Sequence, residues 1–350
     1  MTTGLAIGKF WPPHLGHHHL IQTLSARCSR VVVIVCASST QLPTGRDRAV
    51  WLQTVHPGAE IIVVDDFCAW HHPDACPEDC SRAWANRVLE LRLGSIDEVA
   101  TSEPYGVRFS ECLGASHFEV DAPRLTYPVS SSQIRVDLSH HWIFLHRVVR
   151  AGLTRKVVVL GAESTGTTTL ASDLSSRFGS PCVAEAGRLV SWDLFARNGN
   201  DMDRVKWTEN DFWQIVDHQM WMEQRAVDAI IDEMPGELGP WIVGDTDTLA
   251  TVAWWERYLG TPADSLRRFA ESRTADLYLL TDPDGVDFDD SDPLRDGRSV
   301  RQGMHGRFIE LLEGAGRPWQ LVSGDREERV ATALHAIQTH EKVHPRWRHH

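Results

Sequence analysis

The chain has 350 residues, of which 42% are hydrophobic and 24% charged, and its formal net charge is −13. This length exceeds what one modest hydrophobic core needs, so two domains of ordinary globular composition are expected. The acidic balance argues against a protein that grips nucleic acid through its phosphates, because such binding needs a basic surface. A net negative charge is still compatible with binding small anionic ligands, since a few local cations and helix N-termini can hold a phosphate.

Three further features narrow the class of protein. No stretch of about 18 apolar residues is present and the first residues lack the pattern of a signal peptide, so we expect a cytoplasmic protein without a membrane span. The seven cysteines are odd in number and scattered, which fits reduced thiols better than a disulfide framework. The segment with Cys68, His71, His72, Cys76 and Cys80 lacks a second matched cysteine pair, and we interpret it as a loop with incidental thiols rather than a zinc site.

Strand-like and helix-like segments alternate through the first half of the chain. A short apolar strand is expected over residues 5–10 and a helix over residues 17–28, after a loop of Pro, His and Gly. Val31–Ala37 is a near-continuous apolar run, typical of a strand buried on both faces. The alternation continues with a strand at 60–64, a helix at 81–93 and a strand at 98–101. This order predicts a doubly wound parallel sheet.

A second α/β series begins after residues 150–154, where we place the domain boundary. A strand over residues 156–160 runs directly into a Gly-rich turn, and a long helix that bears Trp residues is expected over 209–232. The remaining expected elements are strands at 241–244 and 277–281, an acidic loop with arginines at 282–301, and a helix at 326–340. The sequence therefore predicts two α/β domains with doubly wound parallel sheets, residues 1–150 and residues 155–342.

The loop after the first expected strand carries a histidine pattern, Gly8-Lys-Phe-Trp-Pro-Pro-His14-Leu-Gly16-His17. It lies where the carboxyl end of a strand meets a helix, which is the crevice in which α/β sheets bind ligands. His14 and His17 can face one phosphate and donate hydrogen bonds to the charge that builds as a P–O bond breaks, while Lys9 adds a positive charge. The alternative is a histidine-rich helix start whose imidazoles only cap the helix.

A second segment, Pro128-Val-Ser-Ser-Ser-Gln-Ile-Arg135, strengthens the phosphate interpretation. Hydroxyl groups, free backbone N–H groups and a guanidinium at a helix start together form a cradle for a triphosphate. Arg46 and Arg48 precede Trp51 in a loop after the second strand, where they are candidates for binding the phosphate of a second substrate. Two solvated loop arginines are an equally open alternative.

The Gly-rich turn after residue 160 has the spacing of a P-loop, Gly161-Ala-Glu-Ser-Thr-Gly166-Thr167-Thr168-Thr169. Its glycines and backbone amides can cradle phosphates, and Thr168 stands where the magnesium-binding hydroxyl belongs. Thr167 stands where a P-loop has lysine, so the cation that should neutralise the β- and γ-phosphates is missing. Two interpretations stay open, a kinase that obtains this charge elsewhere and a domain that binds a nucleotide without turnover.

Together these segments resemble a known family. The histidine loop and the serine-rich segment are similar to the HxGH nucleotidyltransferases, and residues 101–106 and 120–124 resemble the NadR-type nicotinamide mononucleotide adenylyltransferases. Three segments of the second half resemble the ribosylnicotinamide kinase half of NadR-type proteins: Val183–Arg188, Thr208–Phe212 with Gln219, and Gly244–Thr248. The resemblance extends from about Gly4 to about Glu313, with the adenylyltransferase first and the kinase second.

For the first domain, the resemblance implies adenylyl transfer from ATP to nicotinamide mononucleotide, giving NAD and pyrophosphate. The attacking phosphate is already an anion, so positioning and charge stabilisation carry the rate rather than a protein nucleophile. His14 and His17 are the expected catalytic residues, and Ser130-Ser-Ser132 stands where the family has Ser-Gly-Thr. The expected ATP-binding residues are Gly8, Lys9, Phe10, His14, His17, Ser130, Ser132 and Arg135, and the expected substrate-binding residues are Arg46, Arg48 and Trp51.

For the second domain, the resemblance implies ATP-dependent phosphorylation of ribosylnicotinamide to nicotinamide mononucleotide. Thr168 and Asp245 are expected to hold Mg²⁺, and the catalytic base is either Asp245 or Glu185, which the sequence does not separate. The acidic loop over residues 282–301, with Arg295, Arg298 and Arg301, stands where the family carries a lid that closes over the phosphates. We hypothesise that one of these lid arginines, Arg298 or Arg301, supplies the charge missing from the P-loop. The expected ATP-binding residues are Gly161, Ser164, Thr165, Gly166, Thr167, Thr168, Thr169, Arg295, Arg298 and Arg301, and the expected substrate-binding residues are Arg188 and Asp247.

The sequence thus favours an NAD salvage enzyme whose partners are small-molecule nucleotides (ATP, nicotinamide mononucleotide, ribosylnicotinamide and NAD), with Mg²⁺ as cofactor and ATP as co-substrate. Two alternatives stay open: an adenylyltransferase for another mononucleotide or cofactor precursor, and a nucleotide-sensing regulator with a degenerate kinase domain. Larger members of the family start with a helix-turn-helix repressor domain, whereas this chain starts at its first strand, so no nucleic-acid partner is expected. A homo-oligomeric state is left open.

Overall fold

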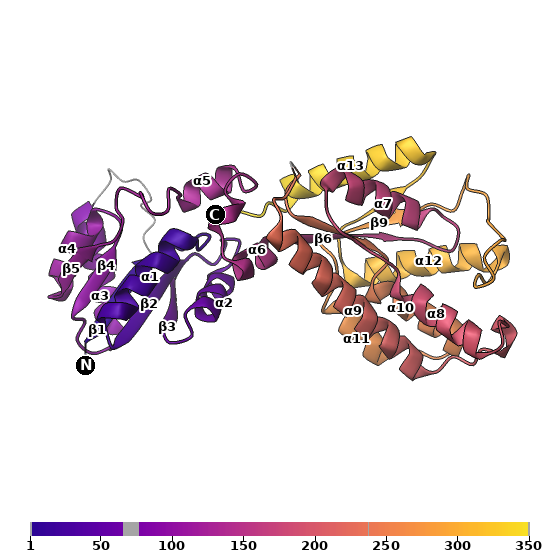
Figure 1. Ribbon diagram of the computed structural model, residues 1–350, viewed down its shortest axis with the longest axis horizontal. Helices are drawn as coiled ribbons and strands as arrows, with labels where there is room; N and C mark the ends of the chain where they lie inside the picture. Colours follow the sequence, from indigo (N-terminus) through magenta and orange to yellow (C-terminus); the bar gives the residue numbers. More distant parts are fainter. Residues whose placement is uncertain (1, 66–76, 237, 349–350) are drawn as a thin grey trace. The chain divides into compact units, whose positions relative to one another are not determined.

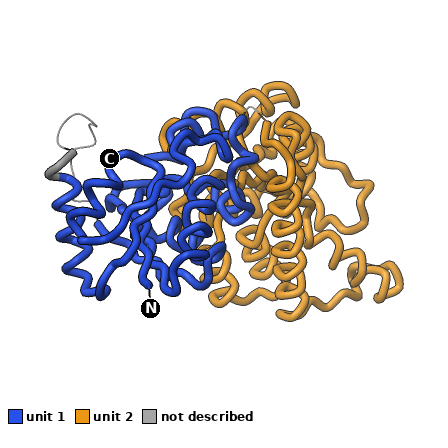
Figure 2. Tube along the Cα trace, turned by 60° about the vertical axis from the view of Figure 1, so that its left-hand side comes forward, with its two compact units in different colours: residues 1–153, 346–350 blue, residues 154–345 orange. Residues whose placement is uncertain are grey.

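The computed structural model describes residues 2–65, 77–236 and 238–348, so that Cys68, His71, His72 and Cys76 lie outside the described residues. The chain divides into two compact units (Figure 2). Unit 1 comprises residues 1–153 and 346–350, and unit 2 comprises residues 154–345. In the described part of the chain, no helix has both the length and the apolar character that a membrane crossing requires.

Unit 1 is built on a five-stranded parallel sheet (Figure 1). Its strands are β1 (Thr3–Gly8), β2 (Arg30–Ala37), β3 (Glu60–Asp65), β4 (Glu98–Thr101) and β5 (Ser116–Glu119). The order β3-β2-β1-β4-β5 reverses at β1, because the chain moves outward to β3 on one side and then to β5 on the other. In an open α/β sheet, ligands bind at such a reversal, beyond the carboxyl ends of the strands. The loops that follow β1 and β4 therefore border the candidate crevice.

Helices cover both faces of the unit 1 sheet (Figure 1). They are α1 (Leu15–Arg27), α2 (Gly45–Val55), α3 (Pro77–Glu90), α4 (Tyr105–Leu113), α5 (Ser131–Val136) and α6 (Arg147–Leu153). Successive residues of a strand point to opposite faces, so the apolar run in β2 serves two cores. Val31, Val33 and Val35 pack with α1 and α2, whereas Val32 and Ile34 pack with α3 and α4. The burial of β2 on both faces, predicted from its sequence, is confirmed.

Unit 2 is built on a second five-stranded parallel sheet, in the order β10-β9-β6-β8-β7 (Figure 1). Its strands are β6 (Arg155–Leu160), β7 (Cys182–Val183), β8 (Trp241–Asp245), β9 (Leu277–Thr281) and β10 (Trp319–Val322). Its helices are α7 (Thr167–Phe178), α8 (Ala186–Arg197), α9 (Glu209–Asp232), α10 (Thr248–Leu259), α11 (Asp264–Glu271), α12 (Arg298–Ala315) and α13 (Arg326–Val343). Val157 and Val159 of β6 pack with α7 and α13, and Val158 and Leu160 pack with the helices from α8 to α12. The predicted α/β class with two parallel sheets is confirmed.

Several elements have the bounds that the sequence predicts, and others, such as β1, α1 and α3, are shifted by a few residues. The bounds of β4, α9 and β9 are those expected, and two short 3₁₀ helices lie at Trp142–Phe144 and Met202–Arg204. The loop predicted over residues 282–301 is wrong at its end, because α12 begins at Arg298. The first turn of α12 reads Arg-Ser-Val-Arg, which continues the arginine-bearing pattern of the preceding loop. Arg298 and Arg301 therefore lie in the first turn of a helix.

Three histidines from separate elements of unit 1 meet in its core. His18 of α1 is 3% exposed, and its Nδ1 lies 2.9 Å from Nε2 of His56, which follows the last residue of α2. The ring of His146 packs edge-on against His18, with 5.6 Å between the centroids. Burial, followed by the nearby His56 and His146, lowers the pKa of His18 to about 3, and burial also lowers the pKa of His56. Both imidazoles are therefore neutral at neutral pH.

Unit 1 is expected to lose stability as the pH falls below about 6.5, the pKa of His18 in the unfolded chain. The folded chain protonates His18 only near pH 3, so the stabilisation is complete above pH 6.5 and decreases as the pH falls towards 3. His18→Gln should make the pH dependence of the unfolding free energy shallower by about one proton in this range. Hydrogen exchange of α1 peptides, corrected for intrinsic rates, measures the slope. An unchanged slope would contradict the prediction, and His335→Gln at an exposed position of unit 2 is the control.

Candidate functional site

The histidine loop of unit 1 joins β1 to α1 at the crevice. Strand β1 ends at Gly8 and α1 begins at Leu15, with His14 in the N-cap position and 7% exposed. The His14 backbone N–H donates to Nδ1 of His17 over 3.3 Å, and the two rings stack with centroids 3.7 Å apart. Phe10 packs edge-on against His17. The two predicted imidazoles therefore lie side by side at the start of α1.

Burial keeps both of these imidazoles uncharged. Burial, followed by Arg124, lowers the pKa of His14 to about 3, and burial, followed by His14, lowers the pKa of His17 well below its usual value. In the described part of the chain, Nδ1 of His14 is buried without a hydrogen-bond partner, which is rare for a buried nitrogen and marks a position that a ligand can satisfy. A Cβ on Gly16 would lie 3.1 Å from the His14 ring, so this glycine keeps the space beside that ring open.

Helix α5 begins beside the histidine loop. Ser130 occupies its N-cap position, where the hydroxyl oxygen accepts a hydrogen bond from the Gln133 backbone N–H. Ser131 donates from Oγ to the carbonyl oxygen of Pro12 over 3.0 Å, across 119 residues of sequence. The serine-rich segment and the histidine loop, which the sequence identifies separately, are therefore joined by a direct hydrogen bond.

Arg135 connects α5 to the same loop a second time. Its Nη1 donates to the carbonyl oxygen of Trp11 over 2.6 Å, and its Nη2 donates to Oγ of Ser132 over 3.0 Å. The guanidinium carbon also lies 4.2 Å from the centroid of the Trp11 ring, which is a cation–π distance. A positive charge and a serine hydroxyl thus lie beside the histidine loop, as the triphosphate cradle predicted from the sequence requires.

The residues proposed for the second substrate of unit 1 have different surroundings. Arg48 is fully buried, and its guanidinium donates to the carbonyl oxygen of Lys9 over 2.5 Å and to Oε1 of Gln41 over 2.9 Å. Trp51 is 6% exposed and packs against α6. Arg46 is exposed on the first turn of α2. This geometry favours a structural role for Arg48 and Trp51, and Arg46 is the accessible member of the set.

In unit 2 a Gly-rich loop joins β6 to α7, which begins at Thr167. Ser164 and Gly166 have positive φ angles of 60° and 85°. Gly161 has no room for a side chain, because a Cβ there would lie 2.0 Å from Oγ1 of Thr281. Such a tight passage from strand to helix is how a P-loop presents its backbone N–H groups to phosphates. Of the other predicted loop threonines, Thr165 is buried and Thr169 is exposed on α7.

Thr168 and Asp245 meet beside this loop. Oγ1 of Thr168 donates to Oδ2 of Asp245 over 2.6 Å, and Asp245 is the last residue of β8 and 5% exposed. Burial raises the pKa of Asp245, and the hydrogen bond from Thr168 opposes that rise. Hydroxyl and carboxylate oxygens are ligands that Mg²⁺ prefers. No cluster of three or more His, Cys, Asp and Glu side chains among the described residues could hold a metal, so Mg²⁺ would also need phosphate and water oxygens, as nucleotide sites provide.

A cavity of about 150 Å³ opens beside the P-loop of unit 2. Its polar lining includes Glu163, Thr167, Thr168, Glu185, Arg188, Gln219, Asp245 and Arg295. Burial, followed by the nearby Asp245, raises the pKa of Glu185 to about 7, and burial raises the pKa of Glu163 to about 7. Carboxyl groups that exchange protons near neutral pH are the usual general bases of catalytic sites. Glu163 is a cavity residue that the sequence did not single out.

One side of the same cavity is aromatic, which the sequence did not reveal. Trp207 stacks on Tyr258 with 4.9 Å between centroids and 14° between planes, and Trp254 stacks on Tyr258 at 5.9 Å. The Tyr258 hydroxyl donates to Oδ1 of Asp296 over 3.0 Å. Trp254 and Tyr258 have the i, i+4 spacing of neighbours on a helix, a signal that fits core packing equally well. Only the fold brings Trp207, from before α9, beside them.

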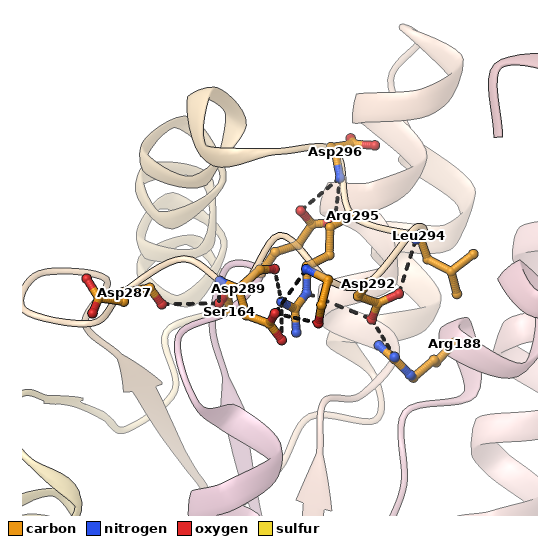
Figure 3. Close-up of polar contacts among 10 residues, drawn as sticks. Ser164, Arg188, Asp287, Asp289, Asp292, Leu294, Arg295 and Asp296 are labelled. Carbon is orange, nitrogen blue, oxygen red and sulfur yellow. Dashed lines mark hydrogen bonds and ion pairs between the residues drawn. The ribbon is translucent and has the colours of Figure 1, made fainter.

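The predicted lid arginines differ in their contacts, and Figure 3 shows those of Arg295. Arg295 lines the cavity and pairs with Asp289 at 3.0 Å and with Asp292 at 3.8 Å. Asp292 also pairs with Arg188, a predicted substrate-binding residue, so the two arginines share one carboxylate at the cavity. Arg298 is exposed in the first turn of α12.

Two buried arginines hold the P-loop through its carbonyl oxygens. Arg301 is 7% exposed and donates to the carbonyl oxygen of Ser164 over 2.9 Å, and Arg329 of α13 is 6% exposed and donates to that of Thr165 over 2.6 Å. Each also donates to a carbonyl oxygen within residues 282–286. Arg329 lies far from the P-loop in the sequence, so no local sequence pattern predicts this contact. Both guanidinium charges lie next to a P-loop that lacks its lysine.

Asp247, predicted to bind substrate, has its carboxylate engaged by groups of the protein itself. It is 1% exposed and caps α10, where its Oδ1 accepts the Leu249 backbone N–H over 2.9 Å. Its Oδ2 accepts the hydroxyl of Tyr278 over 2.8 Å and lies 3.9 Å from Nζ of Lys156. A carboxylate engaged in this way favours helix capping and core packing over contact with a substrate.

A family model, curated relatives and solved structures resemble this chain. A family model described as an AAA domain matches residues 156–329. The proteins described as "Trifunctional NAD biosynthesis/regulator protein NadR" from Escherichia coli (strain K12) and Salmonella typhimurium (strain LT2) are 25% identical over 337 residues and 24% identical over 333 residues. Each alignment covers 89% of this chain and 76% of the relative.

Solved structures have the same fold. A crystal structure of NadR protein in complex with NR matches with a TM-score of 0.64 at 20% identity, covering 97% of this chain and 96% of that one. A crystal structure of NadR protein in complex with NAD and AMP-PNP matches with a TM-score of 0.63 at 19% identity, covering 98% and 96%. The resemblance seen in the sequence is confirmed, and this chain is a homologue of the NadR proteins.

Proposed function

We propose that this chain is an enzyme of NAD biosynthesis with two ATP-dependent activities. Unit 2 phosphorylates ribosylnicotinamide to nicotinamide mononucleotide, and unit 1 transfers the adenylyl group of ATP to nicotinamide mononucleotide, giving NAD and pyrophosphate. The observation that carries the proposal is a P-loop whose adjoining cavity is both acidic and aromatic. Relatives named for NAD biosynthesis, and solved relatives that bind NR, NAD and AMP-PNP, support it.

The aromatic side of the unit 2 cavity suits the base of ribosylnicotinamide. This nucleoside carries a positively charged pyridinium ring and no phosphate. Faces of Trp and Tyr rings attract cations, and the Trp207–Tyr258–Trp254 stack offers such faces. We infer that the ring lies against this stack while the 5′-hydroxyl points to the P-loop, where ATP presents its γ-phosphate.

Phosphoryl transfer then needs a base and compensation for phosphate charge. The 5′-hydroxyl oxygen attacks the γ-phosphorus, its proton passes to a carboxylate, and ADP leaves. Asp245 already accepts the Thr168 hydroxyl, so Glu185, whose pKa lies at about 7, is the base that we propose. Thr168 and Asp245 would hold Mg²⁺, which would supply positive charge to the β- and γ-phosphates.

In unit 1 we propose a nucleotidyltransferase site of the HxGH type. The 5′-phosphate oxygen of nicotinamide mononucleotide attacks the α-phosphorus of ATP, and the bond to the β,γ-pyrophosphate breaks. His14 and His17 have pKa values far below 7 because they are buried, so they act as neutral hydrogen-bond donors to phosphate oxygens. Arg135 supplies the full positive charge, and Ser130 and Ser132 supply hydroxyl groups beside it.

The lid arginines are proposed to replace the P-loop lysine electrostatically. Replacing Arg298 and Arg301 with alanine should lower kcat/KM for phosphorylation of ribosylnicotinamide about 100-fold, because two positive charges near the P-loop are lost. Adding Thr167→Lys to that variant should restore part of the loss, which a merely folding-related defect would not allow. Steady-state kinetics with ATP measures both effects. Full activity in the double alanine variant would refute the compensation.

A product assay tests the two activities at once. The chain is incubated with ribosylnicotinamide, ATP and Mg²⁺, and the products are identified by mass; we expect nicotinamide mononucleotide, NAD, ADP and pyrophosphate. His14→Asn should lower NAD formation about 100-fold while nicotinamide mononucleotide accumulates, because one transition-state donor is lost. Glu185→Gln should block phosphorylation of ribosylnicotinamide while added nicotinamide mononucleotide is still converted to NAD.

Other outcomes of this assay point to the alternatives. Nucleotide binding without any ADP or pyrophosphate would contradict catalysis and favour a nucleotide sensor, the interpretation to which Thr167 points. Pyrophosphate release with a different mononucleotide or with phosphopantetheine, and none with nicotinamide mononucleotide, would assign unit 1 to another cofactor precursor.

A further inference from the structure

Residues 346–348 belong to unit 1, and Trp347 contacts Trp11 of its histidine loop. Arg348 and Leu42 form an isolated antiparallel bridge, with backbone N–H to carbonyl distances of 3.1 and 3.2 Å. The half-buried ring of Trp347 meets the ring of Trp11 edge-on, at 6.3 Å between centroids and 89° between planes. These residues follow the last helix of unit 2 in the chain, yet their contacts lie within the candidate site of unit 1.

Trp11 is the residue on which these contacts converge. Its ring is 3% exposed, and its Nε1–H donates to the carbonyl oxygen of Leu42 over 2.8 Å, the same oxygen that accepts the Arg348 backbone N–H. The Arg135 guanidinium lies 4.2 Å from the centroid of this ring and donates to the Trp11 carbonyl oxygen. Trp11 therefore contacts both the terminal segment, at Trp347 and by way of Leu42, and Arg135 of α5.

We propose that residues 346–348 are a positioning element of the unit 1 site, in which Trp347 and the Arg348 bridge fix Trp11, and Trp11 in turn orients Arg135 towards the triphosphate of ATP. This inference rests on the proposed adenylyl transfer in unit 1. Trp11 and Ser132 occupy two donors of Arg135, and its remaining N–H groups meet the phosphate oxygens. Recognition of phosphate by a guanidinium depends on the orientation of its plane, which the aromatic face beneath it sets.

A purely structural role would have different consequences. If residues 346–348 only stabilised unit 1, their loss would lower its melting temperature and the fraction of active enzyme, and KM for ATP would stay constant. If they orient Arg135, their loss raises KM for ATP selectively, because the binding group is still present but misaligned. KM for nicotinamide mononucleotide and the kinase activity of unit 2 should not change, and the kinase therefore reports in the same molecule that the chain is folded.

The test is Trp347→Ala in the full chain, with adenylyl transfer and phosphorylation of ribosylnicotinamide measured separately. We expect KM for ATP in adenylyl transfer to rise about tenfold with kcat within about twofold, and Trp347→Phe to recover most of the difference by keeping an aromatic edge. Trp221→Ala, the same substitution at an exposed tryptophan of α9, is the matched control and should leave both activities unchanged. In an Arg135→Lys background, Trp347→Ala should have no further effect on KM, because the group it orients is gone.

Each contrary result is distinguishable. An unchanged KM for ATP in Trp347→Ala would overturn the positioning role. So would an equal rise in KM for ATP when Trp347→Ala is made in the chain with Arg135 and in the Arg135→Lys variant. A parallel loss of kinase activity or of folded protein in both Trp347 variants would assign the segment to stability alone and overturn it as well. If the unsubstituted chain makes no NAD from nicotinamide mononucleotide and ATP, the proposed function itself has failed.

Discussion

In each unit a parallel sheet brings the loops that follow its strands to one edge, because all strands run in the same direction. The first strand of each sheet lies at its centre and ends in a loop that starts a helix. In unit 1 this loop carries His14 and His17, and in unit 2 it is the P-loop that ends before Thr167. Every polar group that we assign to a nucleotide depends on this shared geometry.

The two sites meet phosphate charge in different ways. In unit 1 burial removes the charge of the histidines, and Arg135 carries the positive charge beside them. In unit 2 the P-loop has no lysine, and the arginines around it come from α12, from α13 and from the loop before α12. Arg301 and Arg329 hold the loop by its carbonyl oxygens, which turns guanidinium charge towards the loop while fixing its shape. Their charge sits in a chain whose formal net charge is −13, so it must act locally.

Local patterns predicted what depends on neighbours in the sequence. The apolar run of β2, the strand-to-helix junctions and the P-loop spacing are all visible in short windows, and the corresponding elements are present. The roles of Arg48 and Asp247 could not be read in this way, because an arginine or aspartate near a motif looks the same whether it meets a ligand or the protein's own carbonyl oxygens and amides. Burial decides between these roles, and burial is a property of the whole fold.

Contacts between residues far apart in the sequence also could not be predicted from local patterns. The aromatic stack needs Trp207 and Tyr258 from separate elements, Arg329 reaches the P-loop from α13, and Trp347 reaches Trp11 from the far end of the chain. None of these pairs has a fixed spacing that a motif could record. They become visible only when the sheet order and the return of the chain to unit 1 are known.

The most direct test of the account is the number of ATP sites. Isothermal titration calorimetry of the full chain with AMP-PNP and Mg²⁺ should detect two binding events per chain. Thr168→Val should weaken one of them and Arg135→Ala the other, because each side chain touches only its own site. A single site that responds to neither substitution, or no heat at all, would contradict the claim that both strand-to-helix junctions bind a polyphosphate.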